Sequence, residues 1–139
     1  MKTIFTTIAL LILPTLCLAE SCPDIKTIKS NTLTGWTARD SDDGKPLNAK
    51  RTAFFKKNIE QFTLAEWVTD GKQKGNMHCY YSDKNGSGLE AYLTKESFRP
   101  NNLKHYWYQV SGSMHCAAGM GECLFQQINL SNQPHLAKK

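Results

Sequence analysis

Four cysteines constrain the fold of this chain more than any other feature of its sequence. They are Cys22, Cys79, Cys116 and Cys123. A fifth, Cys17, lies in an N-terminal segment typical of an export signal. An even number of cysteines in a small exported domain predicts two disulfides. Four cysteines allow three pairings, and their spacing alone does not choose among them.

The first 19 residues are predicted to be a cleavable signal peptide. Lys2 supplies the initial positive charge, and an uncharged, largely apolar run follows over residues 4–18. Small side chains at Cys17 and Ala19 indicate cleavage before Glu20. Crossing a bilayer takes about 20 apolar residues, which is more than this run provides. Because the run is removed with the signal, we expect no membrane association of the mature chain. The mature chain is therefore expected to be secreted or periplasmic.

Residues 20–139 are the length of a single domain, and we expect residues 129–139 to form a loose tail. The formal charge of the whole chain is +5, and removal of Lys2 with the signal lowers it to +4. Both signs are scattered along the mature sequence, which is typical of a solvated surface. No nucleic-acid-binding motif is present, and we expect no nucleic-acid partner.

Short runs of apolar, aromatic and β-branched residues, separated by turn residues, predict a β-rich domain. Residues 64–68, 77–81 and 89–94 are joined by Gly-rich segments and predict an antiparallel meander. Residues 105–110 and 122–128 predict two more strands. Apolar spacing within residues 47–62 favours one short helix, although a buried strand also fits. The predicted fold is α+β and β-rich, with four to six antiparallel strands, one short helix and two disulfides.

The tripeptide Met-His-Cys occurs twice, at residues 77–79 and 114–116. If the two copies lie on neighbouring strands in register, Cys79 and Cys116 bridge on the inside, which leaves Cys22 for Cys123. His78 and His115 would then lie together on the outside. Met, His and Cys are ligands that copper and zinc accept, so these histidines are also candidate metal ligands. The alternatives are that the repeated tripeptide is a chance similarity and that the protein binds no metal or other cofactor.

Aromatic residues are the other candidates for binding a partner. The candidate binding residues are Trp36, Trp67, Tyr106, Trp107 and Tyr108. Exposed aromatic rows bind sugars or protein partners through large flat contacts. Strand alternation places Tyr106 and Tyr108 on one face and Trp107 on the other. The competing interpretation is that these rings fill the core.

Catalysis is not expected. Disulfide formation would consume the four cysteines, and no nucleophile, zinc or phosphate-binding motif is present. Glu60 and Glu66 are interpreted as solvated surface carboxylates. The polar segment 40–46 predicts a turn and lacks the carboxylates of a calcium loop.

Four short motifs carry a resemblance. They are Cys22-Pro23-Asp24, Gly35-Trp36-Thr37, Cys79-Tyr80-Tyr81 and the closing Cys116 with Cys123-Leu124-Phe125. Together they resemble a family of small secreted bacterial proteins of unknown function, common in intracellular pathogens. The resemblance implies export from a Gram-negative cell and a role at a host interface, and it implies no activity. The Ser111-Gly112-Ser113 segment and the Cys-Tyr strand are also similar to periplasmic lysozyme inhibitors, which are exported, disulfide-bonded β-domains.

We therefore predict a non-catalytic binding module for a protein or glycan partner outside the cytoplasm. Inhibition of a hydrolase such as lysozyme is one alternative. Metal binding through the two Met-His-Cys segments is another.

Overall fold

A computed structural model describes residues 18–30, 32–69, 75–101 and 105–128. Its elements are α1 (Ile25–Lys29), β1 (Thr37–Asp40), α2 (Ala49–Asn58), β2 (Gln61–Thr69), β3 (Gly75–Ser82), β4 (Gly88–Glu96), β5 (Phe98–Pro100), β6 (Tyr108–Val110), β7 (Ser113–Cys116) and β8 (Phe125–Gln127). The first 17 residues of the expected signal and the expected tail at 129–139 lie outside the described residues.

The main sheet confirms the predicted β-rich, antiparallel fold. Six strands lie in the order β1-β4-β3-β2-β7-β6, and β5 pairs with β8 in a second, two-stranded sheet. The strands β2, β3 and β4 form the predicted meander. The described part of the chain has two short helices rather than the one expected. The additional helix, α1, spans only five residues, and Asp24 caps it by accepting a hydrogen bond from the Thr27 amide at 2.8 Å.

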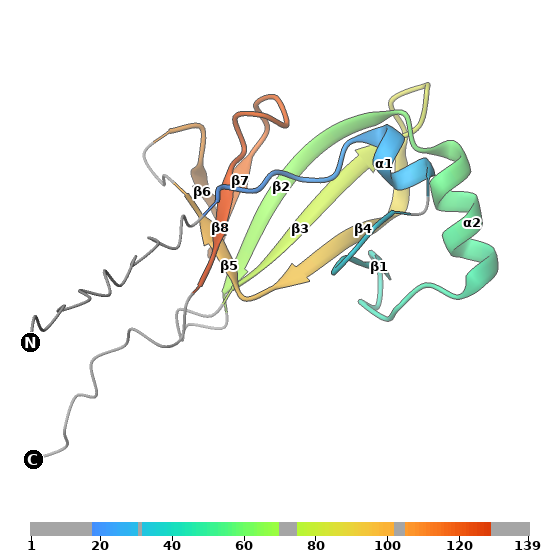
Figure 1. Ribbon diagram of the computed structural model, residues 1–139, viewed down its shortest axis with the longest axis horizontal. Helices are drawn as coiled ribbons and strands as arrows, with labels where there is room; N and C mark the ends of the chain where they lie inside the picture. The colour runs from blue at the N-terminus through green and yellow to red at the C-terminus, as the bar shows by residue number, and fades with distance from the viewer. Residues whose placement is uncertain (1–17, 31, 70–74, 102–104, 129–139) are drawn as a thin grey trace, which may run out of the picture.

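One face of the main sheet, called the inner face below, packs against all the other elements. Phe55 of α2 lies edge-on to Tyr81 of β3, with ring centroids 6.3 Å apart. At the other end, Trp67 of β2 donates its indole N–H to the carbonyl of Phe98 at 2.7 Å. Figure 1 shows the helices at one end of the main sheet and β5 and β8 at the other. The opposite face, called the outer face, carries no described helix.

The disulfides join Cys22 to Cys79 and Cys116 to Cys123, so the predicted pairing is wrong. That prediction required the two Met-His-Cys segments to be neighbours, whereas β2 lies between β3 and β7. The first bridge spans 57 residues and ties down the N-terminus, as expected for Cys22. In the chain-entropy model, closing loops of 57 and 7 residues contributes about 4 and about 2 kcal/mol respectively.

The strand between the two disulfides carries a small residue where they approach it. Ala65 of β2 is opposite Cys79 on one side and Cys116 on the other, and none of the three side chains is exposed. Both cysteines extend from the sheet into the core, where each meets its partner. A methyl group at residue 65 leaves room for both bridges, which a larger side chain would fill.

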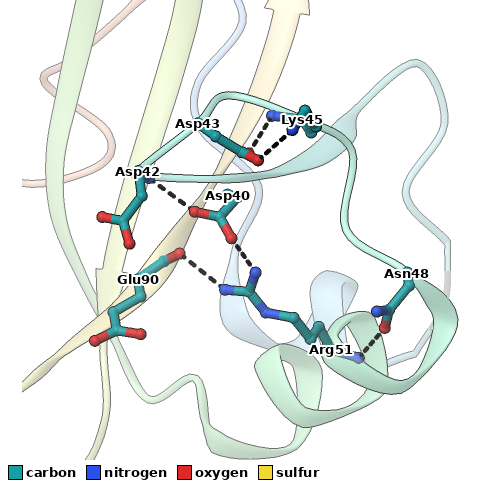
Figure 2. A network of polar contacts seen from close by, with 7 residues as sticks. All are labelled: Asp40, Asp42, Asp43, Lys45, Asn48, Arg51 and Glu90. Carbon is teal, nitrogen blue, oxygen red and sulfur yellow. Dashed lines mark hydrogen bonds and ion pairs between the residues drawn. The ribbon is translucent and has the colours of Figure 1, made fainter.

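A polar network fixes the edge of the sheet beside β1. Arg51 of α2 forms an ion pair with Asp40, and a second guanidinium nitrogen donates to the carbonyl of Glu90 in β4 at 3.5 Å (Figure 2). Asn48 caps α2 by accepting from the Arg51 amide at 2.9 Å. Hydrogen bonds within residues 40–45 close the turn that the sequence predicted. The network therefore joins α2, β1 and β4.

Replacing Ala65 with leucine should destabilise the protein because the added atoms overpack the space between the two disulfides. We expect a loss of about 1–3 kcal/mol in the free energy of unfolding, measured by urea denaturation. The same substitution at Ala53, exposed on α2, is the control and should change stability by about 0.5 kcal/mol or less. Equal effects at the two positions would contradict this packing.

Candidate functional site

The centre of the outer face holds a carboxylate between two imidazoles. Glu66 of β2 is opposite His78 of β3 and His115 of β7, because these residues occupy the same rung of the sheet. His78 Nδ1 lies 3.5 Å from one carboxylate oxygen, and His115 Nε2 lies 3.3 Å from the other. Tyr80 donates its hydroxyl to the His78-side oxygen at 2.8 Å. We call these four residues the central cluster.

Aromatic rings surround the central cluster. The ring of Tyr92 lies 4.5 Å from that of His78 and 5.4 Å from that of Tyr80, measured between centroids. On the opposite side, Tyr108 of β6 lies edge-on to His115, with centroids 6.0 Å apart. Tyr92 is 9% exposed, whereas Tyr108 is 49% exposed. The rings therefore enclose the cluster towards β4 and leave it open to solvent towards β6.

Hydrogen bonding keeps the carboxyl group of Glu66 ionised. The hydrogen bond with His78 lowers the pKa of Glu66 most, the Tyr80 hydroxyl lowers it further, and partial burial opposes both. The resulting pKa is about 2, below the ordinary value of 4.5. Burial, together with the neighbouring carboxylate, raises the pKa of Tyr80, which therefore remains a hydrogen-bond donor. A carboxylate with so low a pKa is a weak general base.

The interpretation of Glu66 as a solvated surface carboxylate is wrong. Its side chain is 19% exposed and contacts His78, Tyr80 and His115, whereas Glu60 is exposed as expected. The two histidines do lie on the outer face, but Glu66 separates them. The cysteines of both tripeptides form disulfides, and Met77 is buried in the core. Within the described ranges, no group of three or more His, Cys, Asp or Glu side chains is placed to hold a metal ion.

An apolar patch adjoins the central cluster at the β6 edge of the sheet. Val68, Tyr108 and Val110 are exposed by 36%, 49% and 37%. Val68 and Val110 lie on either side of Ser113 in one rung, and Tyr108 is opposite His115 two rungs away, on the same face. All three side chains lie on the outer face. We call these residues the edge patch.

The five aromatic residues proposed for binding divide between the core and the surface. Trp107 is 7% exposed, and Trp36 and Trp67 are half-buried against the core. Tyr106 and Tyr108 are exposed, but strand alternation applies only from Tyr108, because Tyr106 precedes β6 and has a φ of 61°. Only Tyr108 belongs to the outer-face site.

Several residues of this site were not predicted from the sequence to belong to a functional site. They are Glu66, Val68, Tyr80, Tyr92 and Val110. Alternation along residues 64–68 does separate Glu66 and Val68 from Ala65 and Trp67, which is the signal that assigns them to the outer face. Their partners on β3 and β7 depend on strand order, which alternation does not contain.

Comparison with models of protein families, with curated proteins and with solved structures gave no match. The resemblance to secreted bacterial proteins therefore stays a prediction. In the described part of the chain, no helix has the length and apolar character needed to cross a membrane.

Replacing Glu66 with glutamine should remove a pH-dependent part of the stability. Because folding lowers the pKa of Glu66 from 4.5 to about 2, its contribution is complete above pH 4.5 and is lost as the pH falls towards 2. After allowance for solvent screening, we expect the variant to lose about 1–2 kcal/mol at pH 7. The difference from wild type should shrink below pH 4.5.

Urea denaturation at pH 7, 5, 4 and 3 measures this difference. The control is Glu122→Gln, an exposed carboxylate away from the central cluster, which should change stability by about 0.5 kcal/mol or less. A Glu66→Gln penalty that is constant across this pH range would contradict the assigned hydrogen bonds.

Proposed function

We propose that this protein is a non-catalytic binding module, acting outside the cytoplasm, that captures an extended segment of a protein partner along β6. The exposed edge strand beside the edge patch carries the proposal. Two disulfides and a β-rich fold suit an oxidising compartment. Main-chain hydrogen bonds to an edge strand provide affinity, and neighbouring side chains provide specificity.

The two edges of the main sheet differ. The chain covers the β1 edge itself, because the Asp40 amide donates to the Lys45 carbonyl and the Leu47 amide donates to the Ala38 carbonyl, both at 2.9 Å. Within the described residues, β6 has backbone pairing only with β7. Proteins usually protect an edge strand with charge, proline or a covering segment. Residues 108–110 read Tyr-Gln-Val, with neither charge nor proline.

The turn between β6 and β7 determines which backbone groups are available. Ser111 and Gly112 have φ values of 45° and 92°, which suit a two-residue hairpin turn closed by the pair Val110 and Ser113. Hydrogen-bonded and non-hydrogen-bonded pairs alternate along antiparallel strands, so the N–H and C=O of Gln109 point away from β7. An added strand would bond to these two groups and cover the edge patch with its side chains.

Inhibition of a hydrolase such as lysozyme is a second candidate. Ser111 and Gly112 are exposed at the tip of the β6–β7 hairpin, beside the edge patch, where a loop is able to enter a cleft. Metal binding through the Met-His-Cys segments has less support, since the cysteines are bridged. We expect no catalytic activity.

Peptides selected from a random-sequence display library on the mature protein test the proposal. The selected peptides should lose at least about tenfold in affinity for Val110→Asp, because the charge lies in the buried contact. Phe54→Asp is the control, since Phe54 is 62% exposed on α2, and it should bind like wild type. Hydrogen exchange at the Gln109 amide should slow on binding, because this amide gains a partner.

Peptides that bind both variants equally, with unchanged exchange at Gln109, would contradict the proposal. Adding the mature protein to lysozyme at equal concentration separates the second candidate. Loss of lysozyme activity that Val110→Asp restores would favour inhibition through the same edge.

A further inference from the structure

A polar cavity of about 550 Å³ lies at the opposite edge of the main sheet from β6. It is lined by Glu20, Gly35, Thr37, Arg39, Thr94, Lys95, Glu96, Phe98 and Gln127. β1 begins at Thr37, opposite Thr94, whereas β4 continues to Glu96. The cavity therefore lies where β4 extends past the start of β1. Its volume is within the range of small-molecule sites, roughly 300–1,000 Å³.

The charged side chains of the lining balance one another. The Lys95 ammonium lies 2.5 Å from a carboxylate oxygen of Glu20, so this pair is already satisfied. The ammonium also lies 4.7 Å from the ring centroid of Phe98, which holds it against the wall. Arg39 and Glu96 add one charge of each sign. A ligand with a net charge would be attracted by one of these two side chains and repelled by the other.

Thr94 provides the observation that points to a ligand. It is 5% exposed, it lines the cavity, and its hydroxyl oxygen has no protein hydrogen-bond partner. A buried hydroxyl without a partner retains its desolvation cost. The hydroxyl oxygen is buried in the observed rotamer, and rotation about χ1 to another staggered position moves it, so the hydroxyl is able to turn towards a partner in the cavity.

We propose that this cavity binds a neutral, hydroxyl-rich ligand, namely a single sugar unit. Sugar hydroxyls both donate and accept hydrogen bonds, which matches the Thr94 hydroxyl, the Glu96 carboxylate and the remaining N–H groups of Arg39. Arg39 donates one of its N–H groups to the carbonyl of Gly44 at 2.8 Å, which orients the guanidinium. The site lies at the other edge of the sheet from the β6 edge and does not depend on the function proposed there.

Titration of the ¹⁵N-labelled mature protein with glucose, galactose, mannose and N-acetylglucosamine tests the proposal, with glucuronate and glycine as charged and zwitterionic comparisons. At least one neutral sugar should shift the amides of Thr37, the 94–98 segment and Gln127. Thr94→Val, which keeps the shape and removes the hydroxyl, should weaken that sugar at least fivefold. The control Thr63→Val, exposed on β2, should leave the affinity unchanged.

Three results would overturn the proposal. They are shifts at these amides with glucuronate or glycine alone, no shift with any neutral sugar, and unchanged sugar affinity in Thr94→Val. A Thr94→Val protein that is more stable than wild type and binds the sugar equally would show that the hydroxyl is only a structural feature. Val110→Asp should bind the sugar like wild type. A failure of the sugar proposal is therefore distinguishable from a failure of the peptide proposal at β6.

Discussion

The close approach of two disulfides on either side of Ala65 is the constraint on which the rest of the structure depends. Cys79 and Cys116 occupy the same rung as Ala65, and each is bridged to a segment that otherwise has few ties to the sheet. One bridge holds the start of the mature chain, and the other closes the loop after β7. A small domain with a thin core gains much of its stability from such cross-links.

The same register explains why the Met-His-Cys tripeptide occurs twice. On the inner face it places a cysteine beside Ala65 and a methionine beside Trp67 on both sides of β2. On the outer face it places an imidazole on each side of Glu66. One repeated tripeptide therefore provides both the cross-linked centre of the core and the polar centre of the outer face.

Alternation along single strands made much of this arrangement predictable from the sequence. It placed Trp107 and Tyr108 on opposite sides of the chain, and Trp107 is buried whereas Tyr108 is exposed. It did not contain the order of the strands, since β2 separates two segments that the repeat suggested were neighbours. The disulfide pairing and the partners of Glu66 both depend on that order, which non-local packing decides.

The two edges of the main sheet differ in their surface chemistry. At β1 the chain covers its own backbone, and the remaining space beyond the strand is polar and balanced in charge. Among the described residues, no strand other than β7 pairs with β6, and the adjoining side chains are apolar. The first arrangement suits a small ligand, and the second suits an extended peptide.

Peptide mapping of the mature protein under non-reducing conditions tests the placement of β2 most directly. No lysine or arginine lies between Lys104 and Lys138, so Cys116 and Cys123 share one tryptic peptide. The structure predicts that this peptide appears alone, lighter by two hydrogen atoms than its reduced form. A second species should join the peptides that contain Cys22 and Cys79. A single species that joins all three cysteine-containing peptides would contradict the account, because it requires Cys79 to bridge to the region after β6.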